Sequence, residues 1–187
     1  MKKVSRFFRE NSLEIAVCLV VVDRECDAEK TAYELGIDVM KVDLSYGFDD
    51  LKSILIELNP DFVVTNVHRI LPVDVINLSP SFLNLHYSIL PAFKGVIGMK
   101  GVIQGRLMGS ALIGATCHVV SEHVDSGEIL AQGALAVGES EKDDIHKVFE
   151  LGWRLLVVCI AQLCGVDGVK EVIGFDNLNA VTSISSK

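Results

Sequence analysis

Short apolar runs alternate with amphipathic stretches along this chain. The apolar runs are rich in Val, Ile and Leu and are typical of strands covered on both faces of a sheet. The stretches between them repeat apolar residues every three or four positions, which predicts helices. Strands are expected at 14–22, 37–42, 61–67, 82–87, 112–120, 128–137 and 169–174, and helices at 1–12, 27–35, 48–58, 72–78, 97–107 and 140–163.

Local stop and start signals support several of these boundaries. Gly36 follows one expected helix, and Asn59-Pro60 follows another, because proline disfavours helix in the residue before it. Ser140, with Asp143 three residues later, is a weak capping-box pattern. The repeated strand–helix alternation predicts an α/β protein with three layers, a Rossmann-like topology and a mostly parallel sheet.

The length of the chain and its polar end predict one domain with a tail. At 187 residues the chain suits a single domain, expected over residues 1–174. Residues 175–187 end in a polar, Ser-rich segment, which we expect to be a weakly ordered C-terminal tail.

Composition and charge narrow the classes of function. Half of the residues are hydrophobic, enough for a sizeable core, and the net charge is −8. An acidic chain is a poor match for nucleic acid, although Lys2, Lys3, Arg6 and Arg9 gather in one short segment. An RNA-binding arm would explain that cluster, but a solvated helix face is the preferred interpretation. The most apolar segment, 155–163, is too short to cross a membrane.

The five cysteines are dispersed, and none forms a CxxC pair. Such a set favours reduced thiols, so we expect a cytoplasmic location and no metal site.

Asn84 and His86 are the first candidates for chemistry. They lie two residues apart on an expected strand and therefore project to the same face. An amide can hydrogen-bond a carbonyl oxygen that gains negative charge, and an imidazole can donate, accept or polarise. Two polar residues at the end of a strand are the simpler alternative.

Asp125 and His118 belong to a second candidate segment. Asp125 begins an Asp-Ser-Gly turn, where a carboxylate can reach over a pocket and orient a histidine or a water, although such turns are common. An aspartate close to His86 would favour the imidazolium form. His118 taken alone is more often a hydrogen-bonded core residue than a catalyst.

Taken together, the two segments resemble the 10-formyltetrahydrofolate-dependent formyltransferase family. The first signature is Asn84-x-His86-x-Ser88-x-Leu90-Pro91 followed by Phe93-Lys94-Gly95. The second is Gly114-Ala115-Thr116-x-His118 followed by Asp125-x-Gly127-x-Ile129. The resemblance runs from about residue 14 to residue 163 and implies the fold of that family, with 10-formyltetrahydrofolate as co-substrate and no metal.

The resemblance also implies roles for individual residues. Asn84 would hold the formyl oxygen, His86 would polarise it or move a proton, and Asp125 would organise His86 and a water. One wall of the folate site would consist of Arg69, Ile70 and Leu71, and the other of Glu122, His123 and Val124. Substrate-binding or supporting positions would be Ser88, Pro91, Gly95, Thr116, His118 and Gly127.

The chain also departs from the family pattern. Members usually begin with a strand and a Gly-Ser-Asn loop that cradles a substrate phosphate, whereas Met1 falls in the helix after that loop. We therefore expect the strand and the loop to be missing, which exposes a sheet edge that a partner subunit, as in a homodimer, could cover.

The formyl acceptor stays open at this stage. A small-molecule amine of the glycinamide ribonucleotide type or an amino sugar ranks first and water, as in a formyltetrahydrofolate hydrolase, second. A catalytically idle binding module ranks third.

Overall fold

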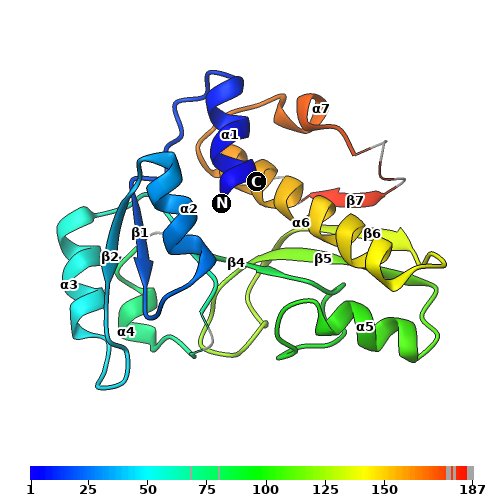
Figure 1. Cartoon of the computed structure of the whole chain (residues 1–187), viewed down its shortest axis with the longest axis horizontal. Helices are drawn as coiled ribbons and strands as arrows, with labels where there is room; N and C mark the ends of the chain where they lie inside the picture. The colour runs from blue at the N-terminus through cyan, green and yellow to red at the C-terminus, as the bar shows by residue number, and fades with distance from the viewer. Residues whose placement is uncertain (68, 80, 176–177, 179, 185–187) are drawn as a thin grey trace. The chain divides into compact units, whose positions relative to one another are not determined.

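The computed structural model describes residues 1–67, 69–79, 81–175, 178 and 180–184. The chain groups into two compact units, Met1–Pro60 and Asp61–Lys187, and each combines helices with strands (Figure 1). The domain limits expected from the sequence, 1–174 and 175–187, stay a prediction. His68 lies outside the described residues, as does part of the expected tail.

The first unit is built on two parallel strands. Its elements are α1 (Lys2–Glu10), β1 (Leu19–Val22), α2 (Asp27–Leu35), β2 (Asp38–Lys41) and α3 (Asp49–Leu58). Helix α2 contacts both strands, and Ile54 of α3 joins Val42 and Leu44 in a small core. Leu19 and Val21 pack against that core, because alternate residues of a strand point to one face.

The second unit contains a five-stranded sheet. Its elements are β3 (Val63–Thr65), α4 (Val73–Ile76), β4 (Phe82–His86), α5 (Lys100–Leu107), β5 (Leu112–Val119), β6 (Ile129–Ala136), α6 (Glu141–Leu163), α7 (Val169–Ile173) and β7 (Val181–Ile184). The strand order is β3-β4-β5-β6-β7.

The strand pairing is mixed. A mostly parallel sheet was expected, and parallel pairing is found at β1–β2 and β3–β4, but the other pairs, from β4 to β7, are antiparallel. Residues 120–128 join β5 to β6 without a crossover helix, and so short a connection only suits antiparallel neighbours.

Two segments near the C-terminus differ from the sequence-based expectation. Residues 169–173 form a helix and not a strand, because Val169 and Ile173 are the buried side chains and are four positions apart, as one helix face requires. Within the segment expected to be weakly ordered, Val181–Ile184 forms β7, which pairs with β6.

The two faces of the sheet in the second unit carry different side chains. Helix α6 packs on β4, β5 and β6 (Figure 1). Gly152 of this helix meets Leu85, and Leu151 lies close to Gly133. Since neighbouring residues in a strand point to opposite faces, Asn84, His86, Thr116, His118 and Gln132 lie on the face away from α6. One face of the sheet therefore packs against α6 in the core, and the other face carries the polar residues of the site.

No helix among the described residues combines the length and the apolar character needed to cross a membrane.

Candidate active site

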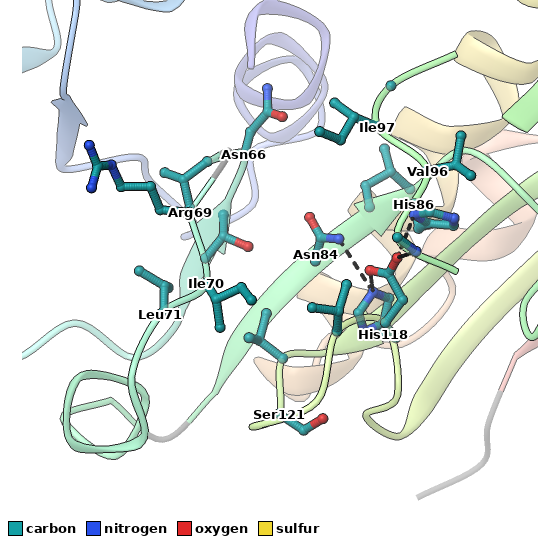
Figure 2. A pocket seen from close by; sticks show the side chains of 18 of the residues that line it. Asn66, Arg69, Ile70, Leu71, Asn84, His86, Val96, Ile97, His118 and Ser121 are labelled. Carbon is teal, nitrogen blue, oxygen red and sulfur yellow. Dashed lines mark hydrogen bonds and ion pairs between the residues drawn. The ribbon is translucent and has the colours of Figure 1, made fainter. Parts of the chain in front are cut away.

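A cavity of about 430 Å³ opens in the second unit, above the end of β4 (Figure 2). Its lining comes from the segment after β3, the end of β4, the loop before α5, the end of β5 and the turn before β6. The lining residues are Thr65, Asn66, Val67, Arg69, Ile70, Leu71, Asn84, Leu85, His86, Tyr87, Gly95, Val96, Ile97, Gly98, His118, Val120, Ser121, His123, Val124 and Asp125.

The amide of Asn84 is held by His118 on the neighbouring strand. The two residues are opposite each other in the register of β4 and β5, and Asn84 Nδ2 lies 3.3 Å from His118 Nε2. On its other side, His118 Nδ1 lies 2.8 Å from the Val119 carbonyl oxygen, which can only accept. Nδ1 of His118 therefore carries a hydrogen, and in the neutral ring Nε2 accepts from the Asn84 amide. This leaves one N–H of Asn84 for the cavity.

Asp125 joins the two histidines. Its Oδ2 lies 3.3 Å from His86 Nδ1, and its Oδ1 lies 3.5 Å from His118 Nε2. The backbone N–H of Gly95 donates to Oδ2 at 2.7 Å, which stabilises the charged carboxylate. Asp125 has a left-handed backbone with φ of 48°, a conformation that aspartate tolerates better than most residues. The turn thus aims the carboxylate back at the sheet.

His86 is buried, and both of its ring nitrogens face oxygen atoms. Nδ1 faces Asp125, and Nε2 lies 3.1 Å from the carbonyl oxygen of Phe93. Burial lowers the pKa of His86 below its ordinary value, and the opposing effects of Asp125 and the Phe93 carbonyl are smaller. Asp125 does favour the imidazolium, as expected, but the loss of water on burial has the larger effect, so the pKa of His86 is lowered overall.

The expected folate walls are mostly at the cavity. Arg69, Ile70 and Leu71 all line it; Ile70 is 68% exposed, whereas Leu71 is buried. Of the second expected wall, His123 and Val124 line the cavity, but Glu122 does not. Glu122 is instead exposed.

The expected supporting residues divide into two groups. Gly95 and His118 line the cavity, whereas Ser88, Pro91, Thr116 and Gly127 do not. Ser88 and Thr116 instead hold the loop after β4: Thr116 Oγ1 donates to the Ser88 carbonyl oxygen at 2.7 Å, and Ser88 Oγ donates to that of Ala92 at 2.6 Å. A Cβ at Gly127 would collide with the Val119 carbonyl oxygen, so glycine permits the close approach of the turn to β5.

Two participants were missed in the sequence. The Phe93 carbonyl is a backbone group, and no side-chain pattern marks it. Gln132 donates from Nε2 to the Leu90 carbonyl oxygen at 2.8 Å and to Thr116 Oγ1 at 3.1 Å. A signal for Gln132 did exist, because it is a polar residue within the otherwise apolar strand β6.

Among the described residues, no group of three or more His, Cys, Asp and Glu side chains could hold a metal ion.

Fold and site together define a class: an α/β protein whose cavity brings an amide, two imidazoles and a carboxylate to one place, a set that can stabilise charge at a carbonyl oxygen. Residues 36–150 match the family described as formyl transferase. The chain belongs to this formyl transferase family.

Curated relatives include enzymes with different named acceptors. Phosphoribosylglycinamide formyltransferase of Mycobacterium tuberculosis is 34% identical over 83% of this chain and 75% of its own length. Methionyl-tRNA formyltransferase of Caldicellulosiruptor saccharolyticus is 26% identical over 75% of this chain and 45% of its own length. The chain thus spans about half the length of some curated relatives that it matches.

Solved structures show the same three-layer α/β fold and confirm the fold class. Glycinamide ribonucleotide transformylase 1 from Symbiobacterium toebii has a TM-score of 0.77 and 26% identity, covering 88% of this chain and 84% of its own. A formyltetrahydrofolate deformylase from Pseudomonas syringae has a TM-score of 0.73 and 25% identity, covering 86% and 56%.

Proposed function

We propose that this protein transfers a formyl group from 10-formyltetrahydrofolate to a small-molecule amine, of the glycinamide ribonucleotide type or an amino sugar. The observation that carries the proposal is the meeting of Asn84, His86 and Asp125 at one cavity, with 3.3 Å between His86 and Asp125. Membership of the formyl transferase family and the likeness to phosphoribosylglycinamide formyltransferase support it.

The cavity suits a folate. Its volume of about 430 Å³ lies in the range of small-molecule sites. Exposed apolar side chains at its edge, Ile70 and Val124, would cover a flat ring system, and the Arg69 guanidinium would pair with a carboxylate. These residues would hold the donor while its formyl group faces Asn84 and His86.

The reaction we propose forms one bond and breaks another at the formyl carbon. The acceptor nitrogen attacks that carbon and gives a tetrahedral intermediate with negative charge on oxygen; the bond to N10 of the folate then breaks. One proton leaves the acceptor nitrogen and one reaches N10, so charge is balanced. Asn84 would donate its remaining N–H to the oxyanion, and Asp125 would take and return the proton through a water.

His86 acts in this scheme mainly as a neutral donor, because burial lowers its pKa. Nε2 faces the Phe93 carbonyl oxygen and Nδ1 faces the Asp125 carboxylate, and both partners accept. We assign the hydrogen of the neutral ring to Nε2, whose contact of 3.1 Å is the shorter. The formyl oxygen would share that N–H with the Phe93 carbonyl, which continues to hold the ring in place. Asp125 would stabilise any positive charge that develops on the ring.

A turnover assay tests the proposal. Purified protein is incubated with 10-formyltetrahydrofolate, with and without glycinamide ribonucleotide or an amino sugar, while tetrahydrofolate, formylated product and formate are measured. We expect formylated amine in the wild type and almost none with His86→Ala. A protein that binds no reduced folate would contradict the proposal and favour an idle binding module.

Water is the second candidate acceptor. The likeness to the solved formyltetrahydrofolate deformylase favours it, as does the Ala92-Phe93-Lys94-Gly95 loop, which resembles that branch. Formate released at the same rate with and without amine would identify a hydrolase.

A cytoplasmic location, action on small molecules without nucleic acid, and a homodimer remain part of this proposal. Sedimentation of the purified protein would test the homodimer.

A further inference from the structure

Gln132 lies in the same row across the sheet as His86. In the strand register His86 is opposite Thr116, and Thr116 is opposite Gln132. Residues paired across antiparallel strands point to one face, so all three side chains share the face that carries the cavity. Gln132 is two strand spacings, roughly 10 Å, from His86 and does not line the cavity. Any influence on the chemistry must therefore pass through other residues.

The amide of Gln132 holds the turn that follows β4. Its Nε2 donates to the Leu90 carbonyl oxygen at 2.8 Å and to Thr116 Oγ1 at 3.1 Å. The buried Thr116 hydroxyl also accepts from the Leu90 N–H at 3.1 Å and donates to the Ser88 carbonyl oxygen at 2.7 Å. Because both partners of Nε2 accept, the amide has a single orientation in which all bonds form.

The same turn carries the contact to His86. Ser88 Oγ donates to the Ala92 carbonyl oxygen at 2.6 Å, and the Ala92 N–H donates to the Ile89 carbonyl oxygen at 3.0 Å. The next carbonyl, that of Phe93, lies 3.1 Å from His86 Nε2. Hydrogen bonds, together with the backbone of residues 88–93, therefore connect Gln132 to the imidazole.

We propose that Gln132 is a positioning residue that orients His86 through the turn of residues 88–93; this inference rests on the proposed function. Without the amide, the carbonyl of the buried residue Leu90 loses a donor, and an unsatisfied buried group makes the turn move. The Phe93 carbonyl moves with it, and the His86 ring loses one of its two fixed partners. Displacements of about 1 Å near reacting groups cost up to roughly 10²-fold in rate.

Two substitutions of similar shape test the inference. Gln132→Met removes the donor, and Gln132→Glu places an oxygen against the Leu90 carbonyl oxygen. We expect kcat for 10-formyltetrahydrofolate turnover to fall about tenfold in the first and further in the second, with KM for the folate nearly unchanged. A role in packing alone predicts equal effects for the two variants. Leu135→Val, in the same strand but on the other face, controls for loss of stability and keeps wild-type kcat.

Two further measurements make the test specific to His86. Nitrogen-15 spectra of the histidine rings should show a protected Nε2–H at His86 in the wild type and lose that protection in Gln132→Met. In a His86→Ala background, Gln132→Met should cost little more, because its effect acts through the missing ring.

Wild-type kcat in Gln132→Met, an unchanged His86 ring signal, or an equal loss in both backgrounds would overturn the inference. If the wild type does not turn over the folate, the proposed function fails, whereas the ring signal still decides whether Gln132 positions His86.

Discussion

The two ends of the cavity are built in different ways. At the polar end, Asn84, His86 and Asp125 are linked by contacts to His118, to the Gly95 N–H and to the Phe93 carbonyl. At the apolar end, Ile70 is 68% exposed and Val124 is 47% exposed. The polar end is held by its own contacts without a ligand, whereas the side chains of the apolar end are exposed and would be covered by a bound ligand.

This difference separates the residues that act on the rate of the chemical step from those that act on the affinity for the folate. Groups held in place by hydrogen bonds meet a developing charge without rearranging, and such groups act on kcat. Exposed apolar side chains contribute when a ligand removes them from water, and they act on affinity. Substitutions at the polar end should therefore change kcat, and substitutions at the apolar end should change the affinity for the folate. A substitution that changed both quantities would contradict the comparison.

The largest expected effect is at the polar end. His86→Ala should lower kcat on the order of 10²–10³-fold, because it removes a donor to the oxyanion and one of the partners of Asp125. The dissociation constant of a folate analogue, measured by calorimetry, should change little. His146→Ala, an exposed histidine of α6, is the control and should keep wild-type kcat. A large loss of folate affinity in His86→Ala would show that the two ends are not separate.

Gly127 tests whether the turn that carries Asp125 is rigid. In Gly127→Ala the new Cβ would collide with the Val119 carbonyl oxygen, so the turn must shift, at a cost of about 1–3 kcal/mol in the free energy of unfolding. Turnover should fall as well, because Asp125 moves away from both histidines.

Gly105→Ala in α5 is the matched control for Gly127→Ala. Its new Cβ would meet Ile113 at an ordinary 3.5 Å, and alanine is a better helix former, so stability should hold or rise. Urea unfolding of both variants checks the pair, and equal stabilities would refute the close-approach argument.

The sequence predicts best what depends on local pattern. The helix at Asp27–Leu35 ends at Gly36, as expected from a glycine in that position, and the φ of Gly36 is 67°. The strand with Asn84 and His86 and the Ser140 cap are also found, since period-two spacing and capping chemistry can be read locally. Local pattern does not show that Asp125 lies beside His86, because the two residues are far apart in the sequence. The family resemblance supplied that pairing.

The sequence predicts less well what depends on packing over a distance. The net direction of the His86 pKa shift depends on burial, which no motif reports. The proposed link from Gln132 to His86 passes through backbone carbonyls of a turn, and Glu122 does not line the cavity although its neighbours do. Helix α7 was mistaken for a strand because so short an apolar segment has no clear period.

A smaller effect is expected at the apolar end. Ile70→Ala should weaken binding of a folate analogue about fivefold, since a ligand would cover less apolar surface, and kcat at saturation should stay the same. Ile56→Ala is the matched control: Ile56 is 66% exposed, close to the 68% of Ile70, but it belongs to α3 and is not one of the residues that line the cavity. A lower kcat with unchanged affinity in Ile70→Ala would reverse the roles of the two ends.

The smallest effect concerns the stability of the polar end against acid. The folded-state pKa of His86 lies below its unfolded value, roughly 6.5, because burial disfavours the charged ring. The folded state therefore binds the proton less readily than the unfolded chain, and stability present above the unfolded pKa is lost as the pH falls through the folded pKa. Urea unfolding between about pH 7.5 and pH 5 should show this loss in the wild type and less of it in His86→Asn. An equal acid dependence in both proteins would mean that the ring gains its proton without cost, and the polar end would then be open to water like the apolar one.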